Sequence, residues 1–248
     1  MAGSEAVIEV RQLHLLDEFQ EVLRLQQLIW GFADIELLPL RFLVVVSKVG
    51  GHVFGAFDGA EMIGFCFAIP GVKPGGRPYL HSHMLGVLPE YHNRGIGRRL
   101  KLKQREEALG RGIHLMEWTF DPLELKNAFF NIERLGAIVR RYHENQYGVT
   151  ASPLHGGLPT DRCVAEWWLD SPRVKAVLAG DSLPHSDSAE RISYPKQIGA
   201  VRAKDQDRAR EIQMENAAKF QEAFARGLAV TGFHAGEEQG TYLLEPWQ

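Results

Sequence analysis

The chain has 248 residues, of which 45% are hydrophobic, so it can bury a substantial core in one large domain or in one domain with an extension. Its 28 lysines and arginines against 31 aspartates and glutamates give a formal net charge of -3. This balance excludes a general electrostatic attraction to nucleic acid or to an anionic membrane, so any anion site must be local.

Cys66 and Cys163 are the two cysteines of the chain, and they form neither a CxxC pair nor a metal-type cluster. Both stand in apolar, strand-like surroundings, so we expect reduced, buried thiols and no metal site. The N-terminus lacks the charged and then apolar pattern of a secretory signal, and nothing approaches the roughly 18 apolar residues of a membrane span. We therefore expect a cytoplasmic protein without nucleic-acid or membrane partners.

Strand and helix patterns alternate through the first half of the chain. Asp17 and Gln20 have capping-box spacing and predict a helix start, and Asp58-Gly59 is typical of a tight hairpin turn. The elements expected there are a strand over 7–13, the helix from residue 17, a short helix after residue 39, strands over 53–57 and 62–69, and a strand over 79–88.

Glycines and prolines delimit the elements in the middle of the chain. The elements expected there are a helix from about residue 95 to 110, a strand over 114–120, a helix over 125–135, and strands over 137–147 and 163–169. Helices interleaved with strands indicate the α/β (α+β) class, with a mixed central β-sheet flanked by helices.

The tail follows a polar, proline-containing stretch over 181–188. Apolar residues at helical spacing from Ala209 to Phe224 predict a helix, with a strand over 191–194 before it and a hairpin after it. We therefore expect three parts, namely a domain over 1–172, a helix and linker over 173–188, and a small α/β extension over 189–248 that packs on the core.

The most informative stretch is VLPEYHNRGIGRRL over 87–100, where a strand, a turn and a helix start follow one another. Gly95 and Gly97 have no side chains, so a pyrophosphate can approach the backbone amides. The positive end of the helix dipole favours such an anion, and Arg94, Arg98 and Arg99 add positive charge.

Two other interpretations of this stretch remain open. One is a glycine-rich turn into a surface helix with solvated arginines. The other is a dinucleotide fingerprint in which Glu117 binds a ribose, although Leu100 replaces its third glycine. A Walker loop is excluded, because no Gly-Lys-Ser/Thr follows the glycines.

The stretch resembles the acyl-CoA loop of the GNAT superfamily, whose pattern is V-x-P-x-x-Q/R-x-x-G-x-G/A. The matching residues are Val87, Pro89, Gly95, Ile96 and Gly97, while His92 stands at the Gln/Arg position. The resemblance implies that the loop holds the CoA pyrophosphate and that the preceding strand pairs with the pantetheine arm. The cofactor-binding residues that it implies are Leu85, Gly86, Val87, His92, Asn93, Arg94, Gly95, Ile96, Gly97, Arg98, Asn127 and Asn131.

The resemblance covers residues 7–169, and the stretches around WTFDPL and PTDRCVAEWWL are similar to a GNAT subgroup with a C-terminal extension. It implies the GNAT fold, acetyl-CoA or another acyl-CoA as cofactor, and transfer of the acyl group to the amine of a small molecule in a ternary complex. A non-catalytic acyl-CoA-binding regulatory module and a nucleotide-dependent oxidoreductase are the alternatives. A homodimer is left open.

Acyl transfer to an amine requires a base for the amine proton, and the strand before the glycines offers histidines. Strand alternation predicts one shared face for Tyr79, His81, His83, Leu85 and Val87. His83 or His81 on this face is a candidate base at neutral pH, with a hydrogen-bonded core histidine as the alternative. Glu117 on the next strand is a further candidate base if it is partly buried, with a structural role as the alternative.

The resemblance also implies a tyrosine that protonates the CoA thiolate, but Ile132 stands at its position. Tyr142 and Tyr147 on the following strand are candidate replacements, with Tyr142 the preferred one, and Asn131 is a candidate cofactor contact. We expect the loop around Asp161 and Arg162 to border the acceptor pocket, with Arg162 pairing with an acceptor carboxylate. A solvated surface turn is the alternative.

Overall fold

The computed structural model describes residues 8–148 and 157–247, and it has the mixed α/β architecture that the sequence predicts. The chain forms two compact units, Met1–Met116 and Glu117–Gln248. Among the described residues, no helix is long and apolar enough to cross a membrane.

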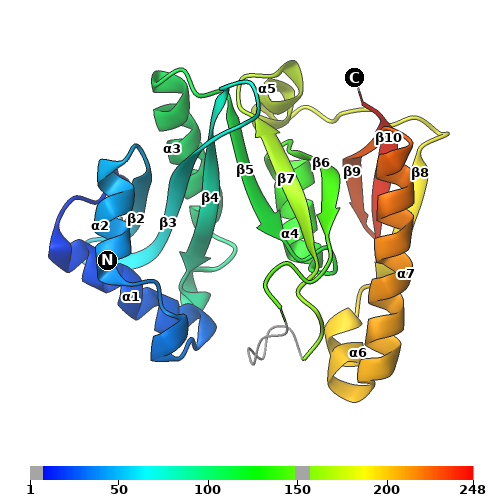
Figure 1. The fold of residues 1–248 in the computed structure, drawn as a ribbon, viewed down its shortest axis with the longest axis horizontal. Helices are drawn as coiled ribbons and strands as arrows, with labels where there is room; N and C mark the ends of the chain where they lie inside the picture. The colour runs from blue at the N-terminus through cyan, green and yellow to red at the C-terminus, as the bar shows by residue number, and fades with distance from the viewer. Residues whose placement is uncertain (1–7, 149–156, 248) are drawn as a thin grey trace, which may run out of the picture. The chain divides into compact units, whose positions relative to one another are not determined.

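The first unit is an antiparallel sheet with helices on both faces (Figure 1). Its strands, in their order across the sheet, are β1 (Glu9–Gln12), β2 (His52–Asp58), β3 (Glu61–Val72) and β4 (Pro78–Val87). Its helices are α1 (Leu16–Trp30), η1 (Asp34–Glu36), α2 (Leu40–Lys48), η2 (Pro89–Tyr91) and α3 (Ile96–Gly110). The predicted hairpin is confirmed, because β2 and β3 pair up to Asp58 and Glu61.

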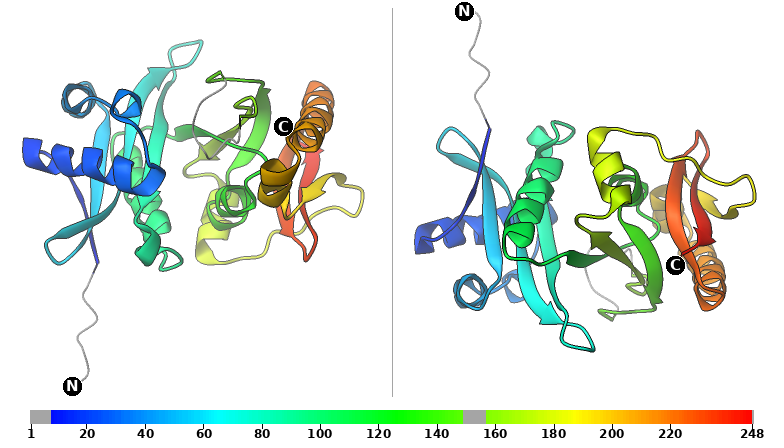
Figure 2. Two further views of the ribbon diagram at one scale, coloured as in Figure 1. Left: turned by 90° about the horizontal axis from the view of Figure 1, so that it is seen from below. Right: turned by 90° about the horizontal axis from the view of Figure 1, so that it is seen from above.

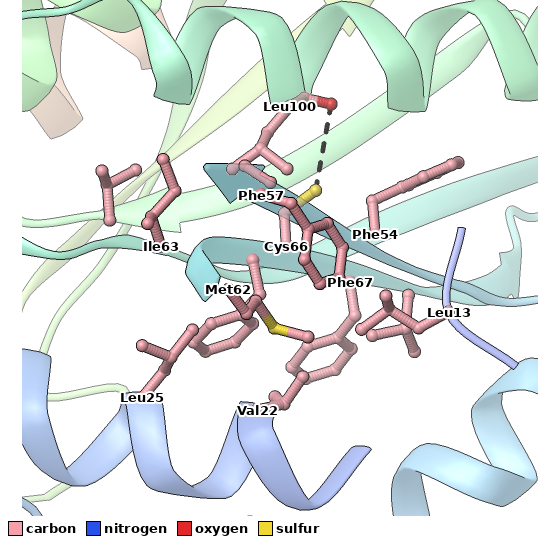
Figure 3. Packing of buried hydrophobic residues seen from close by; sticks show 14 of the residues in the cluster. Leu13, Val22, Leu25, Phe54, Phe57, Met62, Ile63, Cys66, Phe67 and Leu100 are labelled. Atoms are coloured by element: carbon pink, nitrogen blue, oxygen red, sulfur yellow. Dashed lines mark hydrogen bonds between the residues drawn. The ribbon is translucent and has the colours of Figure 1, made fainter. Parts of the chain in front are cut away.

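Alternate residues of β3 supply the core on its two faces (Figure 3). Phe65 and Phe67 face α1 and α2, where their rings lie 5.8 Å from Trp30 and 6.3 Å from Phe42. Cys66 lies between them in sequence and faces α3, where its thiol contacts the Leu100 carbonyl at 3.9 Å. The sheet is therefore covered by α1 and α2 on one face and by α3 on the other (Figure 2).

Both cysteines are free and buried, as the sequence predicts. Burial raises the pKa of the Cys66 thiol to about 12 and also raises the pKa of Cys163. Because the thiolate is the reactive form, both side chains serve as small apolar core residues.

The start of α1 differs from the prediction by one residue and by its cap. The helix begins at Leu16, and the carboxylate of Glu18 accepts the backbone amides of His14 at 2.8 Å and Leu15 at 2.9 Å. The predicted pair of Asp17 with Gln20 is therefore wrong, because Glu18 caps the first turn instead.

The second unit contains a sheet whose strands are ordered β5 (Leu115–Phe120), β7 (Arg162–Trp168), β6 (Ile138–His143), β9 (Leu228–Ala235), β10 (Gln239–Pro246) and β8 (Glu190–Pro195), with β5 beginning in the first unit. Its helices are α4 (Leu125–Phe129), the wider turn η3 (Phe130–Arg134) that continues α4, α5 (Pro172–Ala179), α6 (Ile198–Lys204) and α7 (Gln206–Ala225). The predicted tail hairpin is confirmed as β9 and β10.

The C-terminal segment extends the sheet of its unit. Val230 of β9 pairs with Val139 of β6, so the tail strands β9, β10 and β8 extend the sheet formed by β5, β7 and β6. The tail contains two helices where one was expected. The side chain of Asp205 accepts the Arg208 amide at 2.9 Å and starts α7 after α6 has ended.

Candidate active site

The glycine loop joins β4 to α3 through a tight turn. Gly95 caps α3 in the left-handed conformation with φ 75°, and a Cβ built on it would meet no atom within 4 Å. Among the described residues, no side chain caps α3, and the amides of Ile96 and Gly97 donate to no acceptor. The helix start therefore offers two amide donors and the positive end of its dipole to an anion.

His92 stabilises the turn that precedes these amides. Its Nε2 lies 2.9 Å from the carbonyl oxygen of Val87, and because a carbonyl only accepts, Nε2 carries the proton. Asn93 follows in the left-handed region with φ 62°. The imidazole at the Gln/Arg position of the family pattern thus ties the loop back to the end of β4.

The arginines of the loop have different surroundings. Arg94 lies over the ring of Tyr91, 4.9 Å from its centroid, and the Tyr91 hydroxyl donates to Asp58 at 2.9 Å. Arg99 donates instead to the backbone carbonyl of Ile8, ahead of β1. Arg94 is therefore held beside the loop, whereas Arg99 fastens the helix to the N-terminal strand.

A buried chain of polar side chains fastens α3 to β2 and β4. Lys101 donates to Ser82 at 2.8 Å, Ser82 to Gln104 at 3.0 Å, and Gln104 to Nε2 of His52 at 3.0 Å. Nδ1 of His52 then donates to Glu107 at 2.7 Å. Burial lowers the pKa of Lys101 to about 7 and lowers the pKa of His52. The chain fixes the position of the helix whose first amides form the loop.

The sequence analysis did not predict this hydrogen-bonded series of side chains, although the residue pattern of α3 contained a signal for it. The buried residues of α3 recur at helical spacing, and they are Ile96, Leu100, Lys101, Gln104 and Ala108. The polar residues Lys101 and Gln104 thus fall on the same helix face as the apolar ones, toward the sheet.

A β-bulge at His83 changes the alternation of β4. Ser82 pairs with Ala68 and Met84 with the adjacent Phe67, so His83 is an extra residue without a partner in the register. A bulge arises from the pairing of two strands, and the pattern of β4 alone does not reveal it.

The prediction of a single shared face on β4 is therefore wrong. Before the bulge, His81 pairs with Ile69 and shares the face of β3 that α1 and α2 cover. After it, Leu85 pairs with Cys66 and shares the face covered by α3, as does Val87 two residues later. The extra residue puts the two halves of the strand out of step.

His81 and His83 do lie together on one face. Their ring centroids are 5.9 Å apart, and His83 is 5.4 Å from Phe67. Burial lowers the pKa of His81 to about 4, and burial also lowers the pKa of His83, whose side chain is the more exposed of the two. Both imidazoles are therefore neutral at pH 7 and able to accept a proton.

Glu117 of the second unit is buried and paired with arginine. Its carboxylate accepts from Arg141 at 2.5 Å, and Arg141 also lies 3.3 Å from Glu166, which accepts from Arg140 at 2.6 Å. The buried charge of Glu117 is thus compensated, an arrangement typical of a structural ion-pair network.

Tyr142 and Asp161 are hydrogen-bonded to each other in the second unit. The Tyr142 hydroxyl donates to Asp161 at 2.7 Å, and Asp161 also accepts the amide of Asn145 at 2.9 Å. Burial and then the Asp161 contact raise the pKa of Tyr142 far above its usual value. Arg162 donates to the Asp161 carbonyl at 2.9 Å and lies 5.5 Å from the Tyr147 ring.

The asparagines of the α4 region differ in exposure. Asn131 is buried and accepts from the indole of Trp118 at 3.1 Å, while Asn127 is exposed on α4. Ile132, at the family's tyrosine position, is fully buried. The first unit thus holds His81, His83 and the loop residues 85–98, and the second holds Glu117, Asn127, Asn131, Tyr142, Asp161 and Arg162.

Comparisons with known proteins agree with this fold. Residues 15–136 match the model of the acetyltransferase (GNAT) family, and no curated protein matches the sequence. Among solved structures, the ribosomal-protein-S18-alanine N-acetyltransferase from Escherichia coli is 16% identical with a TM-score of 0.52, covering 66% of this chain and 96% of that one.

Two further solved structures have the same fold. Arabidopsis thaliana NAA60, in complex with a bisubstrate analogue, is 16% identical with a TM-score of 0.53, over 65% of this chain and 98% of that one. The acetyltransferase candidate YncA from Salmonella typhimurium, solved with acetyl-CoA, is 16% identical with a TM-score of 0.53, over 72% of this chain and 98% of that one. The predicted fold is confirmed, and residues 15–136 of the chain belong to the acetyltransferase (GNAT) family.

Proposed function

We propose that the protein transfers an acetyl or other short acyl group from acyl-CoA to the amine of a small molecule, directly and in a ternary complex. The observation that carries the proposal is the start of α3, where two amides without acceptors lie beside the open space over Gly95. The match to the acetyltransferase family supports acyl-CoA as the donor.

The loop residues fit the diphosphate of coenzyme A. In the proposal, the amides of Ile96 and Gly97 donate to the diphosphate, and Arg94 adds positive charge beside it. Residues 85–87 of β4 would offer backbone groups to the pantetheine arm, and His92 would keep the turn closed through Val87. When bound, acyl-CoA supplies an acyl group activated as a thioester. The structure of YncA with acetyl-CoA supports this choice of donor.

We assign acceptance of the amine proton to His83, with His81 as the second candidate. Both rings are neutral at pH 7, and His83 is the more exposed ring and lies at the bulge. A neutral imidazole can take the proton directly or through one water.

No side-chain acid is assigned to the departing thiolate. The Tyr142 hydroxyl already donates a hydrogen bond to Asp161, and its raised pKa makes it a weak acid. A thiolate is a weak base and can leave without a dedicated proton donor. Glu117 is paired with Arg141, so we assign it a structural role, and Arg162 remains the proposed partner of an acceptor carboxylate.

A second candidate function is a regulatory module that binds acyl-CoA without turnover. One observation favours it, namely the buried Ile132 at the position where the family resemblance implies a tyrosine acid. The nucleotide-dependent oxidoreductase considered from the sequence does not fit the acetyltransferase family match.

Calorimetry with coenzyme A and acetyl-CoA tests the donor site, with NAD and NADP as controls. Thiol release from acetyl-CoA then tests turnover with glycine, L-alanine, glucosamine, spermidine and a pentapeptide with a free amino terminus. We expect binding of coenzyme A, no binding of NAD or NADP, and thiol release with at least one amine. Binding without thiol release would favour the regulatory module, and absence of coenzyme A binding would refute both readings.

A further inference from the structure

The connection between β6 and β7 has a hydrogen-bonded base, which we call the neck and define as residues 145–148 and 157–161. Thr160 and Asp161 of the neck are buried, and the Asp161 carboxylate accepts the Asn145 amide at 2.9 Å. The Thr160 hydroxyl accepts one backbone amide and donates to one carbonyl of the opposite side, each at 2.8 Å. The two sides of the neck are therefore tied together by their own side chains.

Helix α7, which belongs to the C-terminal segment (the extension that begins at residue 189), contacts the neck. The amide of Gln213 is buried and donates to the carbonyl of Pro159 at 2.8 Å. Further along the same helix, Phe220 stacks on Tyr142 with ring centroids 5.7 Å apart. Tyr142 in turn donates to Asp161. The helix thus holds the neck directly through one side chain and indirectly through an aromatic stack.

The polar side chain of Gln213 indicates that α7 makes a specific contact with the neck in addition to apolar packing. A helix that only covers a sheet buries apolar side chains, as α7 does with Ala209, Ile212 and Ala217. A buried amide costs free energy unless its donors are used, and that of Gln213 is directed at a loop carbonyl. The contact therefore specifies where Pro159 lies.

Arg162 is the residue through which the neck would act on an acceptor. Its guanidinium donates to the Asp161 carbonyl and lies over the ring of Tyr147, so both sides of the neck determine its position. We propose that Gln213 and Phe220 are positioning residues for the acceptor, because α7 fixes the neck and thereby the guanidinium of Arg162. This inference rests on the proposed acyl transfer and gives the C-terminal segment a role in acceptor recognition and none in acyl-CoA binding.

Two variants test the proposal against a matched control. Gln213→Met keeps the length of the side chain and removes its donor, and Phe220→Leu keeps an apolar residue and removes the stack. Met214→Ala is the control, because Met214 is 64% exposed on the same helix. Hydrogen exchange of the free proteins reports on the neck amides, and steady-state kinetics separate the acceptor KM from the acetyl-CoA KM and from kcat.

We expect faster exchange at residues 145–148 and 157–161 in both variants and not in the control. With the best carboxylate-bearing amine of the panel, the acceptor KM should rise about fivefold, which corresponds to one neutral hydrogen bond, while the acetyl-CoA KM stays the same. Phe220→Trp retains an aromatic ring and should restore the acceptor KM that Phe220→Leu raises. A purely structural role would instead change thermal stability and leave the ratio of the two KM values unchanged.

The inference is overturned if neck exchange and acceptor KM match the wild type in both variants. Phe220→Leu decides the question if Gln213→Met does not fold. A wild-type protein that binds acetyl-CoA but releases no thiol would refute the proposed transfer, and with it the role in acceptor recognition. In that case unchanged exchange would show in addition that α7 does not hold the neck.

Discussion

Lys101 Nζ lies 2.8 Å from Ser82 Oγ in the interior of the first unit, and both side chains are buried. Burial penalises the charged ammonium and lowers the pKa of Lys101 to about 7. The helix that carries the candidate donor loop is therefore fastened to β4 by a group whose charge changes near neutral pH.

Replacing Lys101 with methionine should change how stability depends on pH. The folded-state pKa of about 7 lies below the unfolded value of 10.5, so the unfolded chain binds more protons between these two values. The wild-type free energy of unfolding should therefore rise with pH across that window. Below pH 7 Lys101 is charged in the folded protein as well, and the full cost of burying this charge lowers the stability. The free energy of unfolding of Lys101→Met should lack this pH dependence. The variant should therefore be stabilised most, relative to wild type, below pH 7.

Urea denaturation at pH 6, 8 and 9.5 measures this difference. Lys103→Met is the control, because Lys103 is partly exposed and paired with Glu106 on the same helix. Parallel pH dependences for Lys101→Met and the wild type would contradict the argument.

A bulky side chain at Gly97 should abolish binding of coenzyme A. A leucine there would stand between the helix amides and a diphosphate, and the loss of charge-assisted hydrogen bonds should weaken affinity by about 100-fold or more. Isothermal titration of Gly97→Leu measures the effect. Gly110→Ala at the other end of α3 is the control, because its added Cβ would meet no atom within 4 Å. Unchanged affinity of Gly97→Leu would refute the donor site.

Replacing His83 with asparagine should lower kcat by about 100-fold or more if its imidazole accepts the amine proton. Burial lowers the pKa of His83 and of His81, so the rising limb of the wild-type pH–rate profile should lie below pH 6.5. The variant should lose this limb. His14→Asn, at an exposed histidine, is the control. An unchanged kcat in both His83→Asn and His81→Asn would exclude the histidines as bases.

The glycine loop was predictable from sequence because its determinants are local. Gly95 must adopt a positive φ, and a short run of residues contains the strand end, the turn and the helix start. The order of strands and helices followed from periodicity and from glycine and proline stops for the same reason.

The details of the candidate site depend on partners far along the chain, and periodicity does not report them. The bulge at His83 exists only in the register with β3, and the buried Lys101 is satisfied by Ser82 on another element. Tyr142 was a candidate acid by sequence position alone, whereas its partner Asp161 became visible only in three dimensions.

Tyr142→Phe distinguishes a structural hydroxyl from a catalytic acid. Removing the hydroxyl leaves one acceptor of the buried Asp161 without its donor, so the free energy of unfolding should fall by about 1–3 kcal/mol. Because the phenol is a weak acid in this setting, kcat should stay within about threefold of wild type, well short of the loss that follows removal of a general acid. Denaturation and thiol-release assays measure the two quantities separately. If the turnover rate instead fell by about 100-fold while stability stayed the same, the thiolate proton would come from Tyr142.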